Sequence, residues 1–213
     1  MIARTGRALL RSLKDSTHVG AATLMLPVGQ PTRALLRPIA TLPGATDATD
    51  VALLGEWRNR HVKSFLTEFV ANDGRTAAWL TGAIHRDGGK ILFMLDALDG
   101  TRLGHLGLGF IDWSESYGEA DAIVSGGASP PGLMKEALQA LLRWAREQLG
   151  LRTLAVRVRS DNPAVAFYEK VGFREIRRVP LTVKHQPGMV VWTEDATLAR
   201  SDAYLVHMRY QER

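Results

Sequence analysis

The sequence predicts a mixed α/β domain, an α+β arrangement in which helices flank a sheet, and three features of its second half support this. Apolar side chains recur at helical spacing over residues 134–149, and Gly150 follows where a C-terminal glycine ends a helix. Apolar and polar residues then alternate over 154–159, as in a strand with one buried face. A second helix begins at Pro163 and ends at Gly172.

Length and composition fit one domain with a full core. The chain has 213 residues, of which 46% are hydrophobic and 23% are charged. We divide it into an N-terminal extension, residues 1–32, and a single domain, residues 33–213. No apolar run reaches the roughly 20 residues that span a bilayer, so we expect no stable membrane insertion. Nothing in the sequence argues for secretion, and we expect a cytoplasmic protein.

The composition also limits the chemistry. Cysteine is absent, which excludes disulfides, a thiolate nucleophile and a cysteine metal site. The 6 histidines are dispersed, so we expect no metal site. The formal net charge of +5 favours anionic partners, such as a nucleotide cofactor with phosphates. Because the arginines are scattered and are not interleaved with aromatic residues, we expect no nucleic-acid partner.

The elements of the first half follow in order. Within the extension, basic residues alternate with leucines, which fits a short amphipathic helix or, as we favour, a poorly ordered or domain-covering segment. The first strand is predicted at 34–40, after the extension. A helix over about 50–59 can be capped by Thr49 or Asp50, and a second helix is predicted at 73–84.

The second half contains more strands than helices. Strands are predicted at 91–97 and 103–113, with a hairpin turn at Asp99-Gly100 between them, and a further strand at 119–125. The glycines of the second strand are not followed by a helix, so they form no dinucleotide-binding fingerprint. After the elements already described, the chain is predicted to end with a strand at 173–184, a loop at 186–201 and a strand at 203–210.

One segment resembles a known family. The run NPAVAFYEKVGF, Asn162 to Phe173, is similar to the corresponding segment of the GNAT superfamily of acyl-CoA-dependent N-acyltransferases, and the resemblance is strong from Gly132 to Arg174. It implies the GNAT fold, a central mixed and mostly antiparallel sheet flanked by helices. It also implies transfer of an acetyl group from acetyl-CoA to a primary amine. A homodimer is one assembly that such a domain could form.

The resemblance implies where CoA would lie. Its pyrophosphate would meet a helix N-terminus, where backbone N–H groups and the helix dipole attract negative charge. Pro130 and Pro131 lack N–H groups, and Ser129 and Met134 replace the residues usual in this loop of the family. The pantetheine arm would lie along the strand at 119–125. The cofactor-binding residues implied are Ala122, Ile123, Val124, Gly132, Leu133, Met134, Lys135, Asn162 and Tyr168.

Acylation of an amine also needs an acid and a base. By resemblance the acid is Tyr168, whose phenol can give a proton to the departing thiolate. The base is not identified by the family pattern. Glu119 and Asp121 lie on the strand that should face the acceptor, and His105 and Glu115 are less favoured. Deprotonation relayed by water is a further alternative.

The acceptor is indicated only by a short motif. Trp57-Arg58-Asn59 at the end of a helix resembles a subset that includes amino-sugar N-acetyltransferases and ribosomal-protein-type N-terminal acetyltransferases. A nucleotide-linked amino sugar would then be held by Trp57 or Trp113 and by Arg58. Tryptophans at such positions more often pack in a core. Two alternatives stay open: acetylation of a protein N-terminus or lysine, and a non-catalytic GNAT-like binding module.

Overall fold

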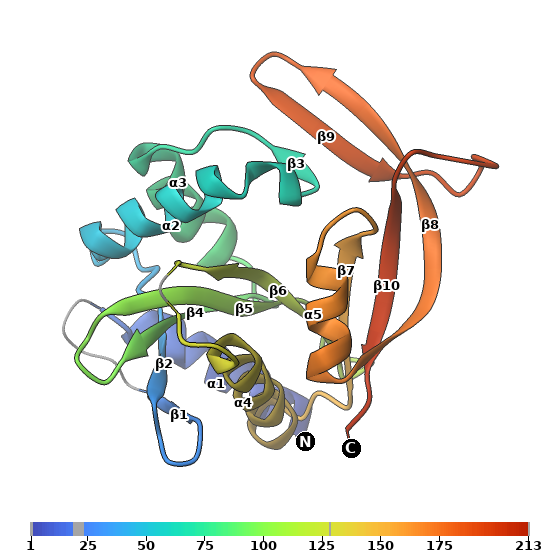
Figure 1. Cartoon of the computed structure of the whole chain (residues 1–213). Helices are drawn as coiled ribbons and strands as arrows, with labels where there is room; N and C mark the ends of the chain where they lie inside the picture. Colours follow the sequence, from blue (N-terminus) through green and yellow to red (C-terminus); the bar gives the residue numbers. More distant parts are fainter. Residues whose placement is uncertain (1, 19–23, 128, 213) are drawn as a thin grey trace.

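The computed structural model describes residues 2–18, 24–127 and 129–212. Figure 1 shows helices on both sides of a central sheet, which agrees with the predicted fold class. The α-helices are α1 (Ile2–Ser16), α2 (Ala48–Arg60), α3 (Asp73–Trp79), α4 (Leu133–Leu149) and α5 (Ala164–Val171), with a short 3-10 helix η1 (Val62–Ser64) and a π-helix η2 (Leu80–Ile84). The strands are β1 (Leu26–Val28), β2 (Ala34–Pro38), β3 (Thr67–Glu68), β4 (Ile91–Ala97), β5 (Arg102–Asp112), β6 (Tyr117–Ser125), β7 (Thr153–Arg159), β8 (Phe173–Gln186), β9 (Met189–Glu194) and β10 (Tyr204–Tyr210).

Within these ranges the strands form one sheet in the order β1-β2-β4-β5-β6-β7-β10-β8-β9-β3. Its neighbouring strands pair antiparallel, except β6 and β7, which run parallel. The mixed, mostly antiparallel sheet is thereby confirmed. Parallel neighbours need a crossover, and α4 supplies it between β6 and β7.

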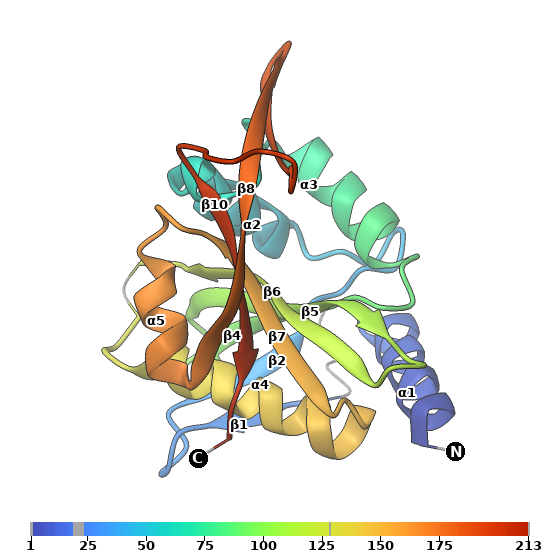
Figure 2. The same ribbon diagram turned by 90° about the vertical axis from the view of Figure 1, so that its right-hand side faces the viewer.

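The sheet separates two main core layers, each formed between one of its faces and the helices that cover it. α1 and α4 cover one face, and α2 and α3 cover the other (Figures 1 and 2). The side chains of β4 alternate between them: Phe93 and Leu95 pack with α4, whereas Leu92 and Met94 pack with α2 and η2. Because β4 is buried on both faces, its sequence reads as a continuous apolar run.

The N-terminal part is packed into the fold. Leu10 and Leu13 of α1 belong to the core, and β1 pairs with β2. The prediction that the first strand begins after residue 32 is therefore wrong. The segment also fits the domain-covering form of the extension better than the poorly ordered one. The Lys14 ammonium is buried and donates to three carbonyl oxygens at 2.6–3.1 Å, those of Ile84, His85 and Asp87.

The start of α2 differs from the prediction. Asp47 is the cap, and its carboxylate accepts hydrogen bonds from the amides of Thr49 and Asp50. Asp50 is fully buried and is held instead by ion pairs with Arg37 at 3.0 Å and with Arg102 at 2.8 Å. These partners come from distant strands, so local sequence could not identify them. No helix in the described ranges is long and apolar enough to cross a membrane.

The predicted loop at 186–201 is wrong in part, because it contains β9. This strand forms a hairpin with β8 across Gly188, which has a φ of +69°. β3 then pairs with β9, and the Trp192 indole donates to Glu68 at 2.7 Å. The Pro187-Gly188 pair between two apolar runs was the signal for a turn. β8 changes partner at Pro180: it pairs with β10 up to this residue and with β9 from Leu181 onward.

Candidate active site

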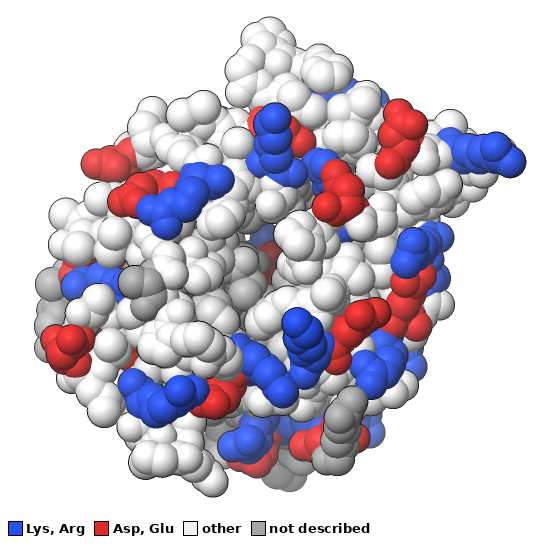
Figure 3. All heavy atoms as spheres, viewed as in Figure 1, with Lys and Arg blue, Asp and Glu red and all other residues white. Residues whose placement is uncertain are grey.

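The divergence of the two parallel strands opens a cavity. β6 and β7 are paired only where Tyr117 to Glu119 meet Thr153 to Ala155. Beyond that point their side chains line opposite walls of a cavity of about 680 Å³. α2 and residues 64–69 close one side, and the start of α5 closes another. Figure 3 shows the hollow near the centre of the face in view.

The wall of the cavity contains backbone strain. Phe110 and Ala122 both line it, and both have a positive φ, of 51° and 49°. Each lies at an irregularity in the pairing of β5 with β6, where one strand has an extra residue. Such conformations cost on the order of 1–3 kcal/mol and gather at functional sites. Here the bulge at Ala122 changes the course of β6 where it leaves β7.

Tyr168 of α5 is placed at this cavity. Its ring is packed edge-on against those of Phe167 and Phe173, with centroids 5.4 Å and 5.8 Å away. In the described part of the chain its hydroxyl has no hydrogen-bond partner. Burial, and then the charge of Asp121, raise the pKa of Tyr168. The phenol therefore stays protonated at neutral pH and can serve as a proton donor.

The two carboxylates of β6 have different surroundings. Glu119 is buried and fully engaged, since it accepts from the Tyr117 hydroxyl at 2.6 Å and from the Arg157 Nε at 2.7 Å. Asp121 is half-buried at the cavity and accepts only from the Ala122 amide, at 2.8 Å, among the residues described. Burial raises the pKa of Asp121. Of the two, Asp121 is the group with capacity to take a proton.

The less favoured base candidates lie in different places. His105 lines the cavity, is buried and stacks on Trp57 with centroids 6.1 Å apart. Its Nδ1 has no hydrogen-bond partner in the described residues, and burial lowers the pKa of His105 to about 4. Glu115 is exposed on a turn that Asp112 caps, and it does not line the cavity.

The residues expected along the pantetheine arm fit such a ligand. Ala122, Ile123 and Val124 line the cavity. Because β6 pairs with β7 only as far as Glu119, the β7 side of these three residues has no strand partner in the described part of the chain. Their backbone groups can meet the amides of an extended ligand. Asn162 also lines the cavity, where its Oδ1 accepts from the Ala164 amide at 2.9 Å and its Nδ2 donates to a carbonyl of residue 64.

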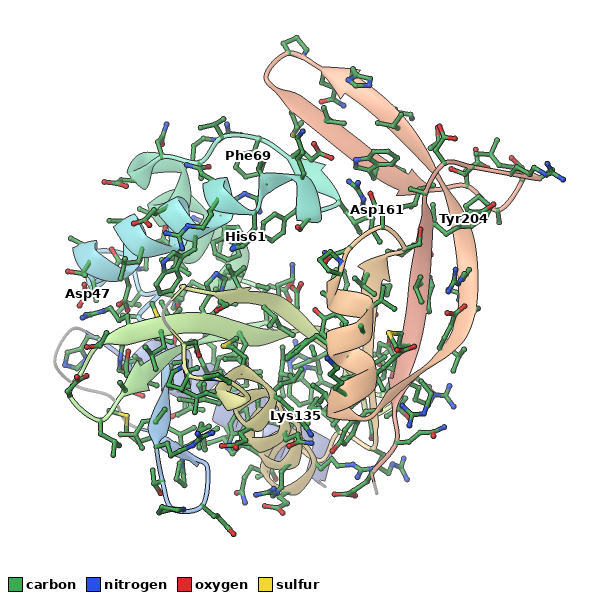
Figure 4. The ribbon with its side chains drawn as sticks, viewed as in Figure 1. Asp47, His61, Phe69, Lys135, Asp161 and Tyr204 are labelled. Carbon is green, nitrogen blue, oxygen red and sulfur yellow. The ribbon has the colours of Figure 1, made fainter. Side chains whose placement is uncertain are left out.

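The start of α4 does not line the cavity, and Pro131, Gly132 and Lys135 are exposed there. Gly132 has a φ of +82°, and an added Cβ there would meet nothing within 4 Å. The expectation that Leu133 binds the cofactor needs correction. Its side chain is buried, and its amide donates to the Pro130 carbonyl at 3.1 Å within the turn. The amides of Met134 and Lys135 have no recorded acceptor in the described ranges. Lys135 is labelled in Figure 4.

The two tryptophans expected to hold the acceptor do not line the cavity, so both expectations need correction. Trp57 is only 2% exposed and belongs to the core between α2 and the sheet. Trp113 packs against the other core layer, and its indole donates to the Gly88 carbonyl at 3.1 Å. Large aromatic side chains bury the most apolar area, which explains why both tryptophans pack in the core.

Arg58, by contrast, does line the cavity, together with residues that the sequence did not single out. Its guanidinium carbon lies 4.4 Å and 4.0 Å from the ring centroids of Phe65 and Phe69. Its Nη2 donates to the Thr67 carbonyl at 2.6 Å. Arg75 of α3 stacks on Phe69 at 4.2 Å. No local pattern signals this group, because the packing of α2, β3 and α3 brings it together.

Comparisons with known proteins give the family and the fold. A model of the acetyltransferase (GNAT) domain matches residues 33–174. No curated protein matches the sequence. A probable acetyltransferase (GNAT family) from Chromobacterium violaceum is 19% identical with a TM-score of 0.65, covering 90% of this chain and 93% of that one. The spermidine N-acetyltransferase of Vibrio cholerae, solved with CoA and spermine, is 16% identical with a TM-score of 0.62, covering 83% and 94%. At these identities the two structures support the fold alone.

Proposed function

The chain belongs to the GNAT acetyltransferase family, and from this premise we propose that it moves an acetyl group from acetyl-CoA to a primary amine of a small molecule. The observation that carries the proposal is that Tyr168, whose hydroxyl has no hydrogen-bond partner among the described residues, and Asp121, whose charge helps to raise the pKa of Tyr168, line the same cavity between β6 and β7. The cavity volume of about 680 Å³ falls in the range typical of small-molecule sites, about 300–1,000 Å³.

The residues have separable roles. Acetyl-CoA would supply a thioester, whose acyl carbon bonds to the amine nitrogen while its bond to sulfur breaks. Asp121 takes the proton that the amine must lose, which its raised pKa favours. Tyr168 gives its proton to the leaving sulfur and regains one from solvent. Glu119 holds Arg157 and Tyr117 in place and does not itself exchange a proton.

The cofactor would be held by backbone groups. The open start of α4, with the amides of Met134 and Lys135, suits the pyrophosphate. The free side of residues 122–124 suits the pantetheine amides. Asn162 at the start of α5 lies where it can orient the same arm.

An amino sugar, linked to a nucleotide, is the acceptor that we propose to test first. What supports it is Arg58, which the resemblance to the amino-sugar subset had singled out and which lies at the cavity. Neither Trp57 nor Trp113 contributes to this proposal, because both are packed away from the cavity.

The experiment is release of the CoA thiol by the purified chain, measured with acetyl-CoA and a panel of amines. The panel holds free and nucleotide-linked amino sugars, polyamines, aminoglycosides and peptides with free N-termini. We expect release with a small amine and a product heavier by one acetyl group. Acetylation of peptides alone would overturn the small-molecule acceptor. Binding of CoA without release for any amine would support a binding module instead.

A further inference from the structure

We propose that the acceptor amine also carries an anionic group, a carboxylate or a phosphate, which Arg58 and Arg75 hold at the α2 and α3 side of the cavity. This inference rests on the proposed function and narrows its substrate class. The cavity would then distinguish two ends of one molecule. The amine lies near Asp121, and the anion meets the edges of the two guanidinium groups, whose faces stack on Phe69.

Arg58 is a partly buried cation whose hydrogen-bonding capacity is not filled by the described residues. Its Nε is inaccessible to solvent and has no hydrogen-bond partner in the described residues. Among the residues that the structure describes, one hydrogen-bond acceptor contacts this guanidinium, the Thr67 carbonyl, which accepts from Nη2 at 2.6 Å. The rings of Phe65 and Phe69 cover its faces and leave the edge of the guanidinium for a ligand. A guanidinium presents donors in a planar fork, which matches a carboxylate or a phosphate.

The second guanidinium makes the local charge imbalance larger. Arg75 stacks on Phe69 as Arg58 does, and its charge, after burial, helps to lower the pKa of Arg58 to about 10. In the described ranges, neither arginine forms an ion pair with a carboxylate. The other cavity-lining arginine, Arg157, is neutralised by Glu119 at 2.7 Å.

A partly buried guanidinium such as that of Arg58, which has no carboxylate partner among the described residues, is costly, and an anionic ligand would reduce that cost. The arrangement is therefore complementary to an anion before any ligand binds. A polyamine offers only positive charge and would be repelled at this end. Figure 4 shows Phe69, which both guanidinium groups contact, in the segment that joins α2 to α3.

The test compares acceptors that share one amine and differ in charge. Glucosamine is the neutral acceptor, glucosamine 6-phosphate carries a phosphate, and muramic acid carries a carboxylate. Spermidine serves as the polycation. We expect kcat/KM to be at least about tenfold higher for one of the two anionic acceptors than for glucosamine. A preference for glucosamine 6-phosphate would identify the anion as a phosphate, and a preference for muramic acid would identify it as a carboxylate.

Three variants locate the effect. Arg75→Gln removes a charge from an exposed residue and should abolish the preference for the anionic acceptor by raising its KM, with kcat and the glucosamine reaction unchanged. Arg58→Gln should also raise the KM for the anionic acceptor, and Arg58→Lys should restore part of the preference, because it keeps the charge without the fork. Arg86→Gln is the matched control. Arg86 is exposed and lies outside the cavity lining, so its loss should leave every acceptor unchanged.

The outcomes separate this inference from the proposed function. If glucosamine or spermidine is used as well as the anionic acceptors, or if Arg75→Gln lowers kcat/KM for all acceptors alike, the anion site is refuted while the acetyltransferase stands. If no amine releases the thiol, the proposed function fails, and calorimetric titration of the two anionic sugars decides the site. Binding that is lost in Arg75→Gln supports it, and no binding by the unsubstituted chain overturns it.

Discussion

Tyr168 shows how one side chain combines packing with chemistry. Its ring lies between Phe167 and Phe173, yet its hydroxyl points to no protein partner in the described ranges. Packing fixes the position of the ring, and the missing partner leaves the hydroxyl for a reacting group. The two contributions can be separated, because phenylalanine keeps the ring and removes only the hydroxyl.

We expect Tyr168→Phe to lower kcat by about 10²-fold, the lower end of what general acid catalysis contributes. The KM for acetyl-CoA should change little, and steady-state kinetics at saturating amine will measure both. Phe167→Leu is the control. It should lower the midpoint of thermal unfolding and leave kcat close to that of the unsubstituted chain. Full turnover by Tyr168→Phe would make Tyr168 a packing residue.

Glu119 and Asp121 lie two residues apart, but loss of charge should affect a different property at each. It should lower activity at Asp121 and stability at Glu119. Asp121→Asn removes the proposed base together with a half-buried charge, so activity should fall at least tenfold while stability is kept or raised. Glu119→Gln leaves Arg157 without its counter-ion and should cost about 1–3 kcal/mol of unfolding free energy. Denaturant unfolding and turnover of both variants check this. Equal loss of activity and stability in Asp121→Asn would argue for a structural role.

The pH dependence of Asp121 follows from the direction of its shift. Burial raises its pKa in the folded chain, so the folded state binds the proton more tightly than the unfolded state. Its contribution to stability is complete below the unfolded pKa and is lost as pH rises through the raised pKa. Activity changes in the opposite sense, because only the deprotonated form is a base. The ascending limb of kcat/KM against pH should disappear in Asp121→Asn.

At the scale of elements, the start of α4 and the divergence of β6 from β7 define where a cofactor can lie. The turn before α4 uses the Leu133 amide internally, and Gly132 keeps the surface open. β6 reaches the cavity as a strand whose β7 side is unpaired after Glu119. Neither feature involves a specific side chain. A test must therefore add a side chain that fills the space proposed for CoA or that changes the charge there.

Gly132→Glu should weaken CoA binding at least tenfold, because its carboxylate would lie near the pyrophosphate and repel it. The φ of +82° strains any residue other than glycine at this position. Gly132→Ala is therefore the matched control, since it has the same strain without the charge. Calorimetry should find CoA affinity near that of the unsubstituted chain in Gly132→Ala. Equal affinity in both variants would place the pyrophosphate elsewhere.

At the scale of the molecule, the N-terminal segment is part of the core that supports the sheet. Leu10 and Leu13 pack with α4, and Lys14 holds the end of η2 through three carbonyl groups. Gly6 lies so close to Leu149 that an added Cβ would be 2.3 Å from its carbonyl oxygen. None of the described residues before Arg33 lines the cavity. We therefore expect removal of the N-terminal segment to lower the stability of the fold and to leave CoA binding unchanged.

A chain that begins at Arg33 should unfold at a lower temperature, because it exposes apolar surface of α4 and leaves the carbonyls of residues 84–87 without Lys14. At a temperature where circular dichroism shows it folded, its dissociation constant for CoA should match that of the full chain. Lys14→Met tests the carbonyl contacts alone and should give a smaller loss of stability. A folded truncation without CoA affinity would assign the segment to the site.

The sequence by itself determined most elements, the fold class and the family. Period 3.6 over 134–149 and period 2 over 154–159 are local consequences of burying one face, so they can be read without coordinates. The segment from Asn162 to Phe173 identified the family for the same reason, because its residues act together in one turn and one helix. From it came Tyr168, Asn162 and residues 122–124, all of which lie at the cavity.

Only the tertiary structure decided which side chains share a space. Trp57 and Trp113 pack in the two core layers, whereas Arg58 meets Arg75 and Phe69, because the packing of separate elements, not spacing along the chain, sets these contacts. Pairing between strands far apart in sequence likewise decided that β9 joins the sheet and that β6 leaves β7 after Glu119. The cavity exists because of that divergence, and long-range pairing has no signature in a local window.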